Sequence, residues 1–181
     1  MPSNPEQPWQ TRDRFLALHS RWMTLIGEHL QDNQGQILDY WRIEKADSVI
    51  VLPIQGDRIL LPSPSYRPGI GQVTLDFPGG RVSAGQTPEQ GAIATLKREL
   101  GFEAASILQL MPLNTEGWAI NSSFSNQKLY GFVAHLDNSA NPSADVTGSI
   151  DSVSLTDVQT LLQTLTCLQC RAVLLEWWLN F

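Results

Sequence analysis

The sequence lacks an excess of positive charge, a long hydrophobic segment and a signal-like start, and each absence excludes a class of protein. Its formal net charge is −6, so it has no electrostatic footprint for nucleic acids or anionic membranes. No apolar run approaches the roughly 18–20 residues that cross a bilayer. Residues 1–8 are polar and rich in proline, without the basic and then apolar order of a secretory signal. We therefore expect a cytoplasmic protein that binds neither nucleic acid nor membrane.

Cysteine is also scarce, because the chain has only Cys167 and Cys170. A Cys-x-x-Cys pair can be redox-active or supply half of a zinc site. There is no second pair, the nearest histidine in the sequence is His135, and the surrounding segment has a helical pattern. We interpret the two cysteines as buried free thiols, with a redox or metal-binding role as the alternative.

The length and composition are those of one folded globular protein. The chain has 181 residues, enough for one core of ordinary size, and 42% of them are hydrophobic while 17% are charged. We predict a disordered tail at 1–8, an N-terminal extension at 9–45 and the main domain at 46–181. The extension combines a helix from Trp9 to about His19 with a β-hairpin whose turn is at 32–35.

The main domain mixes strands and helices without a regular βαβ rhythm. Alternating and β-branched segments predict strands, and apolar residues at helical spacing predict helices. The predicted strands are 48–53, 58–61, 73–77, 106–110, 128–136 and 150–155; the predicted helices are 88–100 and one or two within 156–181. This order indicates a mixed α/β or α+β fold.

One segment, residues 77–102, carries most of the functional information. Its strand ends at Gly79 and Gly80, a loop follows, and a helix begins after Thr87 and ends at Gly101. Glycines let backbone N–H groups approach an anion closely, and a helix start favours negative charge. Alone, the pattern predicts either an anion-binding loop or a turn whose glycines are needed only for its geometry.

The order and spacing of this segment resemble the Nudix box, written Gx5Ex7REUxEExGU with U aliphatic. Gly80, Leu96, Glu99 and Gly101 match the leading glycine, the inner aliphatic residue, the last glutamate and the closing glycine. The preceding stretch, Tyr66-Arg67-Pro68-Gly69 and then Leu75-Asp76-Phe77-Pro78-Gly79-Gly80, resembles the ADP-ribose pyrophosphatase subgroup. The resemblance covers about residues 20–137 and implies a Nudix fold, a mixed β-sheet sandwiched between helices.

The departures from the box concern its metal ligands. Gln86 replaces the first glutamate, Ala94 and Thr95 replace the Arg-Glu pair, and Arg98 replaces the first member of the acidic pair. In the family these glutamates hold Mg²⁺ or Mn²⁺, and positions 95, 98 and 99 share one helical face. Only Glu99 remains as a metal ligand and catalytic carboxylate. One carboxylate is a poor cage for a hard divalent ion, and the guanidinium of Arg98 repels such an ion.

Two alternatives stay open at this helix. Arg98, Glu99 and Leu100 themselves form an Arg-Glu-aliphatic run, but matching that run to the box requires a deletion inside the helix. We therefore prefer the ungapped register. The other alternative is a metal site rebuilt from acids outside the box, such as Glu103 or Asp76.

The resemblance implies two functions. The first is hydrolysis of a nucleoside diphosphate linked to another moiety, such as ADP-ribose, with Mg²⁺ or Mn²⁺ as cofactor and with weak or no activity because Glu99 stands alone. The second is a catalytically inactive sensor or regulator that binds a nucleotide diphosphate, with Arg98 in place of the metal and no cofactor. The candidate substrate-binding residues are Arg67, Gly79, Gly80, Arg98 and Trp41.

Two of these candidates have a structural interpretation as well. Arg67 could form a surface salt bridge instead of contacting substrate, and Trp41 could belong to a core or a dimer interface instead of stacking on a base. The subgroup commonly dimerises through its N-terminal strands, so the resemblance also implies a homodimer.

Overall fold

The structure is a computed structural model that describes residues 8–142, 148–151 and 154–180. These residues form two compact units. Residues 8–46 and 119–127 form the N-terminal unit, and the other described residues form the main unit. The tail predicted at 1–8 lies outside the described residues except for Pro8.

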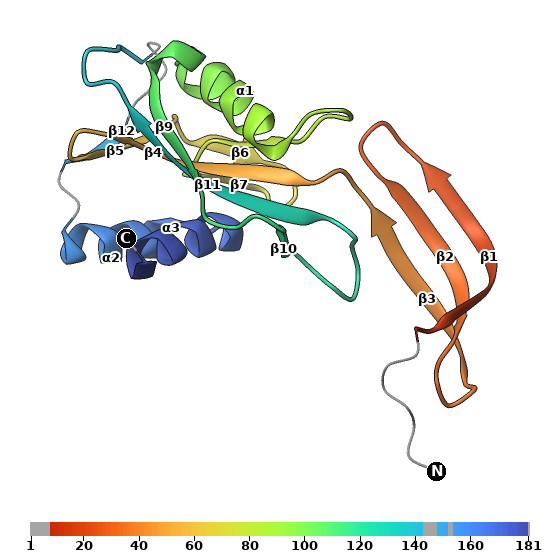
Figure 1. The fold of residues 1–181 in the computed structure, drawn as a ribbon. Coiled ribbons are helices and arrows are strands. Elements are labelled where there is room, and N and C mark those ends of the chain that lie inside the picture. Colours follow the sequence, from red (N-terminus) through yellow and green to blue (C-terminus); the bar gives the residue numbers. More distant parts are fainter. Residues whose placement is uncertain (1–7, 143–147, 152–153, 181) are drawn as a thin grey trace. The chain divides into compact units, whose positions relative to one another are not determined.

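The N-terminal unit is a three-stranded antiparallel sheet in the order β1-β2-β3 (Figure 1). Its strands are β1 (Gln10–His19), β2 (Thr24–Gln31) and β3 (Ile37–Glu44). The predicted hairpin is confirmed as β2–β3, and Asp32 closes its turn by accepting hydrogen bonds from the backbone of Gln34 and Gln36, each at 2.8 Å.

The helix predicted from Trp9 to His19 is wrong, because this segment is the strand β1. Strand β1 pairs with β2 along its whole length, with register shifts after Thr11 and after Arg14. These shifts interrupt the alternation of period two, so the apolar residues fall at spacings that look helical. Tertiary pairing with the hairpin decides the conformation here.

The main unit is built on a mixed sheet in the order β10-β11-β4-β5-β12, with β8 paired to β4 and β9 paired to β11. Strands β4 and β11 are parallel neighbours, whereas β5, β8 and β9 join the sheet antiparallel. The strands are β4 (Ser48–Gln55), β5 (Arg58–Leu61), β8 (Gly79–Arg81), β9 (Ile107–Pro112), β10 (Trp118–Ala119), β11 (Lys128–Leu136) and β12 (Gly148–Asp151). A separate small hairpin consists of β6 (Ser65–Arg67) and β7 (Gln72–Thr74).

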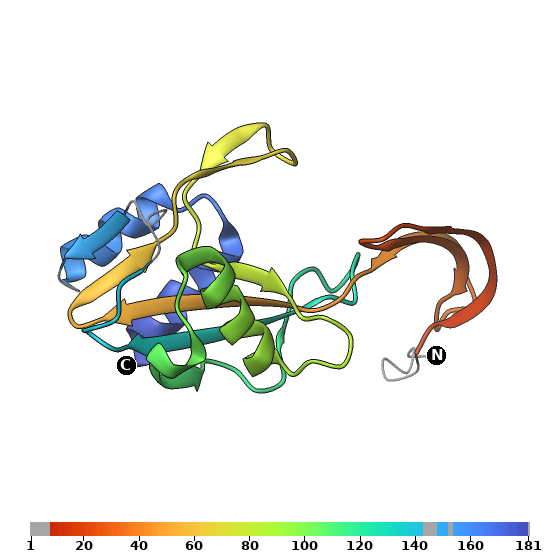
Figure 2. The same cartoon turned by 90° about the horizontal axis from the view of Figure 1, so that it is seen from above.

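Helices cover both faces of this sheet, which confirms the predicted Nudix-type arrangement. Helix α1 (Pro88–Leu100) lies on one face, and α2 (Leu155–Thr164) and α3 (Leu168–Asn180) lie on the other (Figures 1 and 2). A short 3₁₀ turn, η1 (Ala104–Ser106), follows α1. The strand predicted at 150–155 is corrected at its end, because Ser154 caps α2 and Leu155 is its first residue.

Helix α1 is fixed at both ends and along its apolar face. Thr87 and Gln90 form a reciprocal capping box, and Gly101 ends the helix with a φ of 77°, a left-handed conformation that favours glycine. Leu96 and Leu100 are fully buried against β4 and β11 together with Ala92. Because the two ends and the apolar face of α1 are fixed, its polar residues are held in one position beside the loop that precedes the helix.

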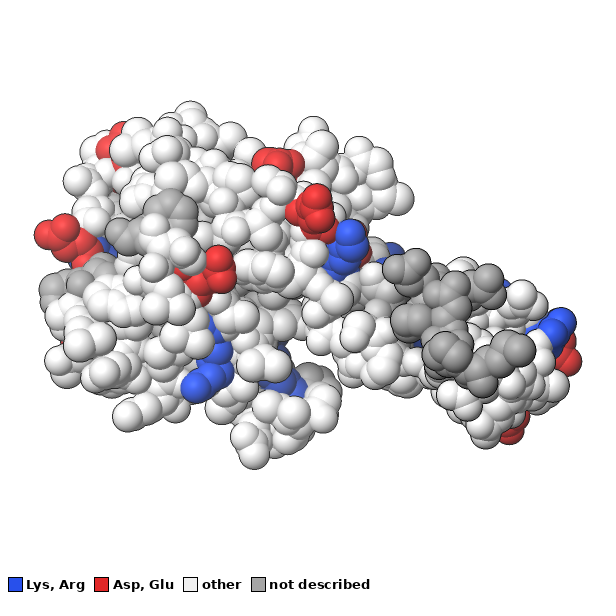
Figure 3. All heavy atoms as spheres, turned by 60° about the horizontal axis from the view of Figure 1, so that its bottom comes forward, with Lys and Arg blue, Asp and Glu red and all other residues white. Residues whose placement is uncertain are grey.

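On the face in Figure 3, acidic and basic side chains are interspersed over a mainly uncharged surface. Among the described residues, no helix is long and apolar enough to cross a membrane.

Candidate functional site

Gly80 brings the loop into direct contact with helix α1. Gly79 and Gly80 pair with Ile50 and Val49 of β4, so the loop that follows them begins beside this inner strand of the sheet. A Cβ atom at Gly80 would lie only 2.3 Å from the Oγ1 atom of Thr95. Thr95 is buried, and its hydroxyl has no hydrogen-bond partner among the described residues. Glycine at position 80 is thus required for close packing of loop on helix.

The single remaining box glutamate is already bonded on both of its oxygens. The backbone N–H of Gly79 donates to Glu99 Oε2 at 3.2 Å, and Arg98 Nη2 donates to Glu99 Oε1 at 2.8 Å. Arg98 Nη2 also donates to the Gly79 carbonyl oxygen at 2.9 Å. Arg98, Glu99 and the Gly79 peptide therefore form one closed hydrogen-bonded group.

A second ion pair lies at the end of the small hairpin. Arg67 donates from both Nε and Nη2 to Asp76 Oδ2, each at 2.7 Å, and Thr74 Oγ1 donates to the same oxygen at 2.9 Å. The Asp76 side chain is only 10% exposed, whereas that of Arg67 is 49% exposed. The guanidinium thus remains accessible while its carboxylate partner is largely buried.

These two groups meet at one cavity. The cavity has a volume of about 230 Å³ and is lined by Pro62, Ser63, Ser65, Arg67, Asp76 and Glu99. Two candidates from the sequence, Arg67 and Glu99, therefore line it together with Asp76, the partner of Arg67. Arg98 and Gly79 are bonded to Glu99 without lining the cavity themselves.

Trp41 and Glu103 are not among the residues that line this cavity. Trp41 is on β3 in the N-terminal unit, where its ring packs edge-on against Phe15 with centroids 5.3 Å apart. Glu103, an alternative metal ligand, forms an exposed ion pair with Lys97 at 2.9 Å. Asp76, the other alternative, is in the cavity wall. Ser63 and Ser65 of the wall were missed, because neither the loop after β5 nor the first residue of β6 carries a recognisable motif.

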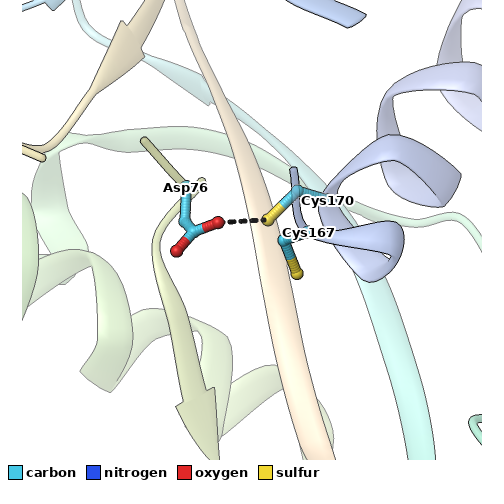
Figure 4. Close-up of side chains that lie close together, drawn as sticks. All are labelled: Asp76, Cys167 and Cys170. Carbon is cyan, nitrogen blue, oxygen red and sulfur yellow. Dashed lines mark hydrogen bonds between the residues drawn. The ribbon is translucent and has the colours of Figure 1, made fainter. Parts of the chain in front are cut away.

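The two cysteines lie against Asp76, as Figure 4 shows. Cys167 immediately precedes α3, and Cys170 is in its first turn. Cys170 is buried, in agreement with the sequence interpretation, whereas Cys167 is half-buried. The Cys170 Sγ atom lies 3.9 Å from Asp76 Oδ1.

The pKa values of the two neighbouring thiols are shifted in opposite directions. A hydrogen bond from the Cys170 thiol lowers the pKa of Cys167 to about 6; burial opposes this, and the backbone N–H groups of Cys170 and Gln169 lower it further. The same thiol–thiol bond and burial raise the pKa of Cys170 well above its ordinary range. Cys167 is therefore the reactive thiol of the pair.

Comparisons with known proteins show which proteins this chain resembles. A sequence profile of the NUDIX domain matches residues 44–177. An uncharacterized Nudix hydrolase of Schizosaccharomyces pombe is 29% identical over 94 residues, which is 46% of this chain and 45% of that protein. A Caenorhabditis elegans protein named as a nudix hydrolase is 23% identical over 112 residues, 56% of this chain and 50% of its own length. The matches thus span about half the length of these relatives.

Among solved structures, the crystal structure of an ADP compounds hydrolase has the same fold. Its TM-score is 0.73 with 21% sequence identity, and the match covers 96% of this chain and 95% of that one.

Proposed function

This chain belongs to the Nudix family, and from that premise we propose that it binds a nucleoside diphosphate linked to a second moiety, of the ADP-ribose type, and hydrolyses it weakly or not at all. The proposed site is the cavity lined by Arg67, Asp76 and Glu99. The fold shared with an ADP compounds hydrolase supports this class of ligand. The observation that carries the proposal is that each carboxylate of the cavity is already paired with an arginine.

Nudix hydrolases generally use a divalent metal ion, and the residues of this box fit such an ion poorly. Both oxygens of Glu99 accept hydrogen bonds from the protein, and Asp76 Oδ2 accepts three. The formal charges of Asp76, Glu99, Arg67 and Arg98 add up to zero. A hard divalent ion needs several free oxygen ligands, usually including more than one carboxylate. We therefore derive no metal-dependent step at this box.

An anionic ligand, by contrast, suits the two arginines. A guanidinium has five N–H donors and binds phosphate through two of them at once. The described bonds of Arg98 use only Nη2, and those of Arg67 use Nε and Nη2. In the proposed complex Arg67 binds the diphosphate from the cavity wall. Arg98 reaches it from beside Glu99 and supplies the positive charge that a metal ion supplies elsewhere in the family.

The second candidate function is metal-dependent hydrolysis of the same ligand. It is favoured by one observation, that Asp76 and Glu99 line the same cavity. In this case Glu99 is the metal ligand and catalytic residue, Asp76 supplies the second carboxylate, and both give up their present hydrogen bonds.

Titration calorimetry with ADP-ribose, in EDTA and then in Mg²⁺ or Mn²⁺, separates the two functions when turnover is measured on the same sample. We expect binding in EDTA, and we expect Arg67→Gln and Arg98→Gln each to weaken it about tenfold or more, because each removes a charge-assisted bond. Lys97→Gln is the matched control, since it removes an exposed charge from the adjacent position of α1. Binding only with metal, and turnover that Glu99→Gln abolishes, would refute the proposal and establish the second function.

A further inference from the structure

A cluster of metal-ligating side chains lies behind the cavity wall. One carboxylate oxygen of Asp76 and the Sγ atoms of Cys167 and Cys170 all lie within 4.8 Å of one another (Figure 4). We propose that Asp76, Cys167 and Cys170 form a binding site for a thiophilic divalent cation such as Zn²⁺. This inference does not depend on the nucleotide ligand proposed above.

The spacing of the three ligand atoms is close to that of a tetrahedral zinc site. With Zn–S bonds of about 2.3 Å and a Zn–O bond of about 2.1 Å, the sulfurs lie about 3.8 Å apart and each lies about 3.6 Å from the oxygen. The distance from Cys170 Sγ to Asp76 Oδ1 is 3.9 Å. Side-chain adjustments of less than about 1 Å therefore assemble the site around an ion.

Asp76 is oriented as a one-oxygen ligand. Its Oδ2 atom accepts the bonds from Arg67 and Thr74, whereas its Oδ1 atom faces the weakly donating thiol of Cys170. Metal-ligating carboxylates are themselves held by such outer hydrogen bonds, which fix their direction. The side chain is largely buried, so it keeps this direction instead of rotating freely in solvent.

The formal charges of the cluster favour a divalent cation. Two thiolates and one carboxylate carry three negative charges, and Arg67 offsets one of them. A divalent cation makes the group neutral, in contrast to the box, which is neutral without an ion.

Asp76 adds a third possible ligand to the two cysteines. Its carboxylate accepts the S–H of Cys170 while the sulfurs are protonated, and it opposes the ionisation of both thiols unless a cation is bound between the three groups. The same carboxylate completes a three-ligand set with soft and hard donors that suit Zn²⁺. Three protein ligands leave a fourth position for water or a bound ligand.

Cobalt titration tests the site, because Co²⁺ replaces Zn²⁺ and reports its own ligands by its absorption spectrum. The full chain is reduced, stripped with EDTA, freed of EDTA and titrated anaerobically with Co²⁺. We expect one ion per chain, a thiolate-to-cobalt charge-transfer band, tetrahedral visible bands, and loss of both on addition of one equivalent of Zn²⁺. Absence of the charge-transfer band in the reduced wild-type chain overturns the proposal, and this measurement needs no variant.

Variants then identify the ligands. Cys167→Ser and Cys170→Ser should each reduce the band and weaken Co²⁺ binding at least tenfold, and Asp76→Asn should weaken binding about tenfold while the sulfur band persists. Glu99→Gln is the matched control, because it removes a nearby cavity carboxylate outside the cluster and should leave the spectrum unchanged. Loss of the band in Glu99→Gln, or unchanged binding in both folded cysteine variants, contradicts the assignment.

Discussion

Substitution of Gly80 by alanine is the sharpest test of how the loop meets helix α1. The new Cβ atom would lie 2.3 Å from Thr95 Oγ1, whereas ordinary contacts of a Cβ atom begin near 3.4 Å. Thr95 is buried and β-branched, so its side chain has little freedom to rotate away. The loop and helix must separate by about 1 Å, and overpacking of this kind costs roughly 1–3 kcal/mol.

The decisive measurement is a double-mutant cycle with Thr95→Ala. This second change removes the clashing oxygen, and it also removes a buried hydroxyl without a described partner, which offsets the loss of its methyl group. We expect the double variant to recover about 1–2 kcal/mol relative to the sum of the single changes. Urea unfolding followed by circular dichroism gives each free energy of unfolding.

The control for this cycle is Gly85→Ala in the same loop. Gly85 has a φ of 82° and nothing within 4 Å of its Cβ position, so alanine there is strained by its backbone alone. Thr95→Ala should not rescue it. The inferred packing of the loop against the helix is wrong if Gly80→Ala costs less than about 0.5 kcal/mol of stability, or if the effects of Gly80→Ala and Thr95→Ala are additive within that margin.

Three further predictions concern charge. Arg98→Glu should strengthen Mg²⁺ or Mn²⁺ binding about 100-fold in calorimetry. The reason is that a two-unit charge change about 6 Å from a divalent ion contributes ~3 kcal/mol even at the dielectric of water. An unchanged affinity refutes this electrostatic explanation. Alkylation of Cys167 should rise with pH through about 6 and then level off, because the thiolate reacts, while buried Cys170 stays unmodified by mass spectrometry until urea is added. Arg42→Met should lower the free energy of unfolding in urea by about 2 kcal/mol, because it leaves the buried carboxylate of Glu28 without its partner at 2.6 Å. Adding Glu28→Leu should restore most of the lost stability.

The sequence predicted the box helix well because its signals are local. Thr87, Pro88 and Gly101 mark the two ends of α1, and Leu96 repeats at helical spacing on the core face. Each of these signals depends on residues within a few positions of one another. The family resemblance named Arg67 and Glu99 as separate candidates, and both line one cavity in the structure.

The features that sequence reasoning missed are non-local. Strand β1 is set by pairing with β2, and the register shifts within β1 hide the alternation of its side chains. The contact of Asp76 with Cys170 joins residues 94 positions apart, after β7 and at the start of α3, so no spacing rule could find it. The homodimer and the cytoplasmic location depend on partners and cellular context outside a single chain, and both stay predictions.

Asp76 links the two proposed sites through its two oxygens. Its Oδ2 atom binds Arg67 in the cavity wall, and its Oδ1 atom faces the sulfur cluster. A cation bound by Oδ1 withdraws negative charge from the carboxylate and weakens its ion pair with Arg67. The guanidinium of Arg67 then binds a phosphate more strongly. If both sites exist, Zn²⁺ should therefore raise the affinity for ADP-ribose. Linkage requires ADP-ribose to raise the affinity for Zn²⁺ by the same factor. If neither ligand changes the affinity for the other in a chain that binds both, Asp76 does not couple the two sites.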